Sequence, residues 1–99
     1  MVKKEILLIA EHYLTLVKEF LDVEDAYLFG SHAHGSPRED SDIDIGIFTN
    51  KMPSDYFSVL KKLYSTRRKV NTLIEPHLLV STKDNSGFDA EVRKGVRLH

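Results

Sequence analysis

Two carboxylates, Asp42 and Asp44, are separated by one isoleucine, and isoleucines continue to alternate after them. In a strand, side chains two residues apart point to the same face. The pattern therefore predicts a strand over 42–48 with both carboxylates on one face and the isoleucines on the other. Adjacent carboxylates repel each other unless a cation lies between them. Mg²⁺ prefers oxygen ligands, often one or two carboxylates together with substrate phosphates, so the pair indicates a metal site.

A glycine and a serine, Gly30 and Ser31, follow the short apolar run 26–29 and begin a polar loop. Glycine lets the backbone approach a phosphate closely, and successive N–H groups form an anion-binding concavity. Taken singly, the glycine could be a plain turn and the carboxylates the solvated face of an edge strand. Their order and short separation favour a site for a nucleoside triphosphate instead.

The order Gly-Ser at 30–31, ten residues, then Asp-x-Asp at 42–44 resembles the signature of the DNA polymerase β-like nucleotidyltransferase superfamily. Gly35 and the run 41–45 match that signature as well. In length the chain is similar to the minimal nucleotidyltransferases, small stand-alone domains of prokaryotes. The resemblance covers about residues 27–75 and implies an α/β nucleotidyltransferase fold, a small mixed sheet packed by helices.

The resemblance also implies a reaction, the transfer of a nucleoside monophosphate to an acceptor hydroxyl with release of pyrophosphate. AMP from ATP is the expected case, with another NTP as the alternative substrate. Asp42 and Asp44 would hold two Mg²⁺ ions that act on the attacking and leaving oxygens. Gly30 and Ser31 would bind the nucleotide through its β- and γ-phosphates. Catalysis of this kind depends on positioning and charge neutralisation, so no covalent nucleophile is expected.

A third carboxylate, Glu75, ends the apolar run 70–75, which predicts another strand, and Pro76 is expected to end its ladder. A surface-facing strand end is one interpretation, since a carboxylate is unusual in a core. The resemblance implies that Glu75 is instead the superfamily's third catalytic carboxylate, which would share a metal ion and could accept the hydroxyl proton. Many members have Asp there. His77 is expected to be structural, and Asp40 is the next candidate for the base.

Three other polar groups have both a structural and a functional interpretation. His32 and His34 could bind a metal, but a His-x-His pair without a third ligand is more often a solvated loop feature. The basic run 66–69 follows a predicted helix over 54–65, whose dipole it would complement; contact with substrate phosphates is the alternative. Arg38 is expected at the surface rather than on a phosphate.

Length and composition limit the class of protein. Ninety-nine residues predict a single domain over 1–99, and the absence of cysteine excludes disulfides and thiolate chemistry. No run is long and apolar enough for a membrane span, so a cytoplasmic protein is expected. Residues 1–50 carry four Lys/Arg and ten Asp/Glu, and residues 51–99 carry ten and five. The halves are therefore −6 and +5, and with a net charge of −1 a dedicated nucleic-acid binder is disfavoured.

Apolar periodicity predicts the remaining elements of the chain. The predicted first helix has large apolar residues on more than one face, because Leu7 and Leu8 lie off its main stripe. A homo-oligomer or a partner protein is expected to cover them. The predicted elements are helices over 3–21, 54–65 and 88–96, strands over 26–29, 42–48 and 70–75, and a short strand or continuation over 78–80.

Only the resemblance to the family indicates what the acceptor of the nucleotide could be. Polymerases and aminoglycoside transferases bind their acceptors with a second domain, for which this chain has no room. Stand-alone relatives are often encoded beside HEPN-type helical proteins, and some are antitoxins that attach AMP to the partner toxin. The resemblance therefore implies a HEPN-type partner. The alternative is a non-catalytic nucleotide-binding antitoxin or regulatory module that acts by partner binding alone.

Overall fold

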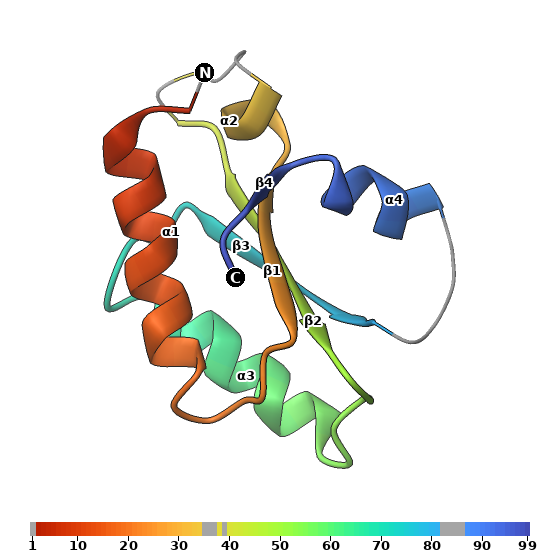
Figure 1. The fold of residues 1–99 in the computed structure, drawn as a ribbon. Helices are drawn as coiled ribbons and strands as arrows, with labels where there is room; N and C mark the ends of the chain where they lie inside the picture. Colours follow the sequence, from red (N-terminus) through yellow and green to blue (C-terminus); the bar gives the residue numbers. More distant parts are fainter. Residues whose placement is uncertain (1, 35–37, 39, 82–86) are drawn as a thin grey trace.

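The computed structural model describes residues 2–34, 38, 40–81 and 87–99, and Figure 1 shows its course. The motif glycine Gly35 lies outside the described residues. The helices are α1 (Lys4–Val17), α2 (Ser31–His34), α3 (Tyr56–Arg67) and α4 (Gly87–Arg93), and the strands are β1 (Asp25–Phe29), β2 (Ile43–Thr49), β3 (Ile74–Val80) and β4 (Val96–Arg97).

The strands form one mixed sheet in the order β3-β2-β1-β4. β1 pairs antiparallel with both β2 and β4, and β2 pairs parallel with β3. A parallel pair needs a crossover, and α3 lies in the connection between β2 and β3. In Figure 1, α1 and α3 lie on one face of the sheet and α4 on the other. The predicted α/β fold, a small mixed sheet packed by helices, is confirmed.

The alternation in β2 separates two hydrophobic clusters, one on each face of the sheet. Ile43, Ile45 and Ile47 are buried in the larger cluster, against α1 and α3. In this layer the Tyr13 hydroxyl donates a hydrogen bond of 2.7 Å to the Leu63 carbonyl and joins the two helices. The smaller cluster, under α4, contains Tyr27, Phe29, Phe48 and Val92.

The two long helices, α1 and α3, were predicted, but their observed ends differ from the predicted ones. α1 ends at Val17 rather than at residue 21, because the chain turns there to reach β1. Phe20 and Leu21 continue the apolar stripe from the turn, where they still pack against the larger cluster. α3 begins at Tyr56, after Asp55, and its last turn extends to Arg67.

The predicted strand over 70–75 is wrong in its bounds. Residues 70–73 lie in turns, and β3 runs from Ile74 to Val80, through Pro76 and the residues that were predicted as a possible continuation. Pro76 does not end the ladder, because β3 is an edge strand and pairs with β2 alone. Glu75 is therefore near the beginning of its strand, not at the end.

The chain's last element was not predicted. The final helix ends at Arg93, and Val96–Arg97 then pair with β1 as β4. Gly95 joins them, where a Cβ would clash with the Leu28 carbonyl, so only glycine fits this close backbone approach. In the described part of the chain, none of the helices has the length and apolarity that a membrane crossing needs.

Candidate active site

The Asp-x-Asp strand and the glycine loop meet at one end of the sheet. Phe29, the last residue of β1, is the register partner of Asp44 in β2, so Gly30 follows beside that carboxylate. Gly30 has a φ of 79°, a left-handed conformation that side chains with a Cβ disfavour. A Cβ built there would clash with Asp44 Oδ2. The predicted phosphate loop and the predicted metal carboxylate are thus in direct contact.

Ser31 begins the short helix α2, which packs back on the loop. The amides of Ala33 and His34 donate to the Gly30 carbonyl at 3.1 and 3.2 Å. His32 is buried, and its Nε2 lies 3.2 Å from the Ser41 carbonyl. The expectation of a solvated His32 is wrong, because the ring ties α2 to the residue before Asp42. His34 is exposed.

The two carboxylates of the motif differ in their surroundings. Asp42 is exposed and precedes β2, which begins at Ile43 rather than at residue 42. The Ile43 amide is already paired, through a 2.8 Å hydrogen bond to the Leu73 carbonyl. Asp44 lies within the strand, and its side chain is 23% exposed. Both carboxylates can therefore be reached from solvent. They flank Ile43, whose amide fixes the backbone through its hydrogen bond to Leu73.

His77 contacts Asp44, a role the sequence interpretation missed. Its Nε2 lies 3.2 Å from Asp44 Oδ1. The ring also packs edge-on against Phe29, with ring centroids 5.1 Å apart, and lies 5.6 Å from the ring of Phe88. The signal was present in the sequence, because His77 lies two residues after Glu75 and so shares its strand face.

Glu75 is the register partner of Asp44 in the parallel pair β2–β3, as a third carboxylate on a neighbouring strand requires. Its side chain, however, is bound by α3. The Tyr64 hydroxyl donates to Glu75 Oε1 at 2.9 Å, and Arg67 Nη1 lies 3.7 Å from Oε2. The hydrogen bond to Glu75 is the main cause that raises the pKa of Tyr64, with burial second.

Arg67 completes this contact between α3 and β3. It donates a 2.9 Å hydrogen bond to the Ile74 carbonyl, and its guanidinium stacks on the Tyr64 ring, 4.9 Å from the ring centroid. In the sequence, Arg67 belonged to a basic run interpreted as a complement to the helix dipole or as a phosphate contact. The structure gives it a third role, as the cation that pairs with Glu75.

The donor chemistry of the motif fits a hard divalent cation, because Asp42 and Asp44 offer accessible carboxylate oxygens. Among the residues that the structure describes, no three His, Asp or Glu side chains are gathered closely enough to hold a metal ion. Glu75 is not gathered with the two aspartates, and its carboxylate contacts Tyr64 and Arg67 of α3 instead. Asp42 and Asp44 are thus accessible to solvent, whereas the Glu75 carboxylate is bound by Tyr64 and Arg67.

Known proteins resemble this chain in family and in fold. A family model described as "Polymerase beta, Nucleotidyltransferase" matches residues 11–98. A Sulfolobus solfataricus protein assigned as a nucleotidyltransferase has the same fold, with a TM-score of 0.66 and 22% identity over 94% of this chain and 78% of its own.

A chain of a mutant MntA-HpeT toxin–antitoxin complex is also similar, with a TM-score of 0.59 and 18% identity. That similarity covers 90% of this chain and 72% of the other. At such identities both likenesses concern the fold alone. No curated protein matches the sequence.

Proposed function

The chain belongs to the polymerase beta family of nucleotidyltransferases, and we propose that it transfers a nucleoside monophosphate from an NTP to an acceptor hydroxyl. One observation supports this above the others, the contact between Gly30 and the Asp44 carboxylate. It brings a backbone that can approach a phosphate next to an oxygen ligand for a metal ion. A triphosphate with its counter-cation requires both groups in one place.

The proposed roles follow from position. Gly30 and Ser31 bind the β- and γ-phosphates, since the loop opens beside Asp44. Asp42 and Asp44 would hold the two Mg²⁺ ions of the proposed site. When bound, the metal supplies charge neutralisation on the phosphates and polarises the attacking hydroxyl. His77 holds the Asp44 carboxylate in place through its 3.2 Å contact.

Glu75 is proposed as the general base that accepts the hydroxyl proton, and as a metal ligand once it turns toward Asp44. Its place opposite Asp44 supports this role. Until then the Tyr64 hydroxyl and the Arg67 guanidinium hold the side chain on α3, through a hydrogen bond and an ion pair. The site would be complete when Glu75 leaves Tyr64 and Arg67 and turns toward Asp44.

We propose ATP as the nucleotide and a partner protein as the acceptor. The fold that this chain shares with a chain of a toxin–antitoxin complex supports a toxin as that partner. The HEPN type of this toxin and its action in the cytoplasm are part of the proposal and follow from the sequence resemblance alone. A non-catalytic antitoxin that binds nucleotide is the second candidate. The engagement of Glu75 by Tyr64 and Arg67 favours that candidate, since a carboxylate held there permanently could not serve as the base.

Incubation with α-labelled ATP, MgCl₂ and candidate acceptor proteins tests the proposal. Labelled acceptor should accumulate with the wild type and not with Asp44→Asn. Asp22→Asn is the matched control, because Asp22 is exposed and precedes β1, at the opposite end of that strand from Gly30. Nucleotide binding with no labelled product, across all four NTPs, would favour the non-catalytic candidate.

A further inference from the structure

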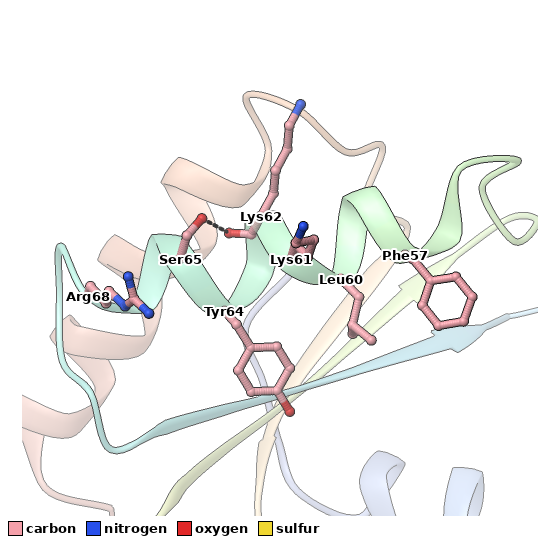
Figure 2. A pocket seen from close by; sticks show the side chains of 7 residues that line it. All are labelled: Phe57, Leu60, Lys61, Lys62, Tyr64, Ser65 and Arg68. Carbon is pink, nitrogen blue, oxygen red and sulfur yellow. Dashed lines mark hydrogen bonds between the residues drawn. The ribbon is translucent and has the colours of Figure 1, made fainter.

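The outer side of α3 has an apolar stripe, of which the proposed reaction involves only the Tyr64 hydroxyl. Phe57, Leu60 and Tyr64 line a cavity of about 660 Å³. Figure 2 shows their side chains projecting to the same side of the helix. Their spacing of three and four residues is that of one helix face. Phe57 is 76% exposed, so the stripe presents a large aromatic side chain to solvent.

Positive charge surrounds this stripe. Lys61, Lys62 and Arg68 line the same cavity, and residues 56–69 contain five Lys/Arg and no carboxylate. Lys62 lies over the Phe20 ring, at 5.5 Å from its centroid. Lys61 and Arg68 form no ion pair with any residue that the structure describes. Among the described residues, the stripe is therefore an apolar surface beside cations that no carboxylate pairs with.

We propose that the α3 stripe docks an acidic amphipathic segment of a partner protein, with its apolar residues in the cavity and its carboxylates on Lys61 and Arg68. Helices bind such grooves through apolar anchors at the same spacing of three, four and seven residues. Complementary charge at the rim selects the partner and speeds association.

A second copy of the chain fits this surface poorly. A symmetric dimer places the same patch on both sides of its interface, which here sets cations against cations. A single-stranded nucleic acid would also meet cations and aromatic rings. Leu60 is an aliphatic side chain between the two rings (Figure 2), and the chain has a net charge of −1. Both features favour the protein partner.

A single hydrogen bond, from Tyr64 to Glu75, connects the docking surface to the candidate active site. Tyr64 lines the cavity, while its hydroxyl donates to Glu75, which lies opposite Asp44 in the sheet. A partner that contacts the Tyr64 ring therefore acts directly on the contact that holds Glu75. The inference goes beyond the proposed transferase activity. The docking surface is tested by peptide binding and not by activity, so the docking proposal and the proposed transferase activity can fail independently.

Two synthetic peptides of about 15 residues serve as probes, each with leucines at helical spacing. The remaining positions are glutamate in one peptide and lysine in the other. Fluorescence anisotropy should show binding of the glutamate peptide only, and amide shifts in the spectrum of the ¹⁵N-labelled chain should map to α3. Phe57→Ser should weaken binding roughly tenfold, as expected for an exposed aromatic anchor.

Charge reversal makes the test specific. Lys61→Glu/Arg68→Glu should lose the glutamate peptide and gain the lysine peptide. Leu8→Ser and Lys3→Glu/Lys4→Glu are the matched controls, because they alter an exposed leucine and two exposed lysines of the α1 segment, and both should bind like the wild type. In the wild type, the peptide should also shift the Glu75 and Asp44 amides, through the hydrogen bond from Tyr64 to Glu75. Tyr64→Phe should keep the peptide on α3 but lose these two shifts.

Several outcomes would overturn the proposal. These are an absence of peptide-dependent shifts on α3, shifts confined to another face, equal binding by Phe57→Ser, and equal binding of the two peptides. If a single-stranded oligonucleotide bound to α3 more tightly than the glutamate peptide, the surface would be assigned to nucleic acid instead of a protein partner. Light scattering that shows a dimer of the wild type but a monomer of Phe57→Ser would assign the surface to a second copy instead.

Discussion

Gly30 carries two constraints that no other residue type meets. Its φ of 79° disfavours a Cβ, and the Asp44 carboxylate occupies the place where a Cβ would lie. Gly30→Ala should lower the free energy of unfolding by about 1–2 kcal/mol, which is the cost of left-handed backbone for an L-residue. It should also displace Asp44 and abolish binding of Mg²⁺-ATP, which calorimetry measures.

Gly87→Ala is the control for Gly30. Gly87 is the first residue of α4, its φ is not in the left-handed region, and a Cβ there would meet nothing within 4 Å. That variant should keep wild-type binding and stability. If Gly30→Ala matched Gly87→Ala in both measurements, the loop at Gly30 would be only a turn.

His77 tests how strongly Asp44 must be held. His77→Phe keeps a ring against Phe29 and Phe88 but removes the nitrogen that contacts Asp44. Stability should change by less than about 1.5 kcal/mol, the usual range for one hydrogen bond. Affinity for Mg²⁺-ATP should fall, because the carboxylate is free to rotate. Retained affinity by calorimetry, with the fold intact, would make His77 a packing residue only.

At the scale of elements, Tyr13 joins α1 to α3 and makes their packing sensitive to alkali. Burial raises the pKa of Tyr13 well above its ordinary value near 10. The folded chain thus keeps this proton at a pH where the unfolded chain loses it. The resulting stability is complete below pH 10 and is lost as pH rises above it. Urea unfolding at pH 8 and pH 11 should show a smaller loss for Tyr13→Phe than for wild type.

The elements also show what the sequence could predict. Alternation over Ile43, Ile45 and Ile47 predicted β2, since a strand with one face in each cluster needs that period. Pro76 predicted a strand end, and the prediction failed because proline's effect depends on whether the strand is at an edge, which only the sheet order decides. β4 has only two residues, which are too few to show a periodicity of apolar residues. They form a strand because they pair with the edge of β1.

The candidate site was predicted to a similar extent. Gly30, Asp42 and Asp44 are close in sequence, so their motif could be recognised, and the hairpin-like pairing of β1 with β2 brings Gly30 to Asp44. The partners of Glu75 could not be predicted. Tyr64 and Arg67 reach it because α3 crosses beside the edge strand, and nothing in the local sequence encodes that approach.

For the whole molecule, nucleotide binding should appear as stability. A ligand that binds only the folded state raises the free energy of unfolding by about 2.7 kcal/mol at a hundredfold excess over its Kd. Saturating Mg²⁺-ATP should therefore raise the melting temperature of the wild type, and EDTA should cancel the rise if the metal joins the phosphates to the carboxylates. Asp42→Asn/Asp44→Asn should show no rise. Its own melting temperature without ligand should equal or exceed that of the wild type, because the substitution removes two like charges.

Circular dichroism melts of both proteins, with ATP, MgCl₂ and EDTA in all combinations, measure these effects. Asp22→Asn again serves as the control and should respond to Mg²⁺-ATP as the wild type does. A rise of the same size in the double variant would place the nucleotide elsewhere on the molecule. A double variant that melts far below the wild type would instead show that the two carboxylates support the fold, since accessible like charges without a cation should not stabilise it.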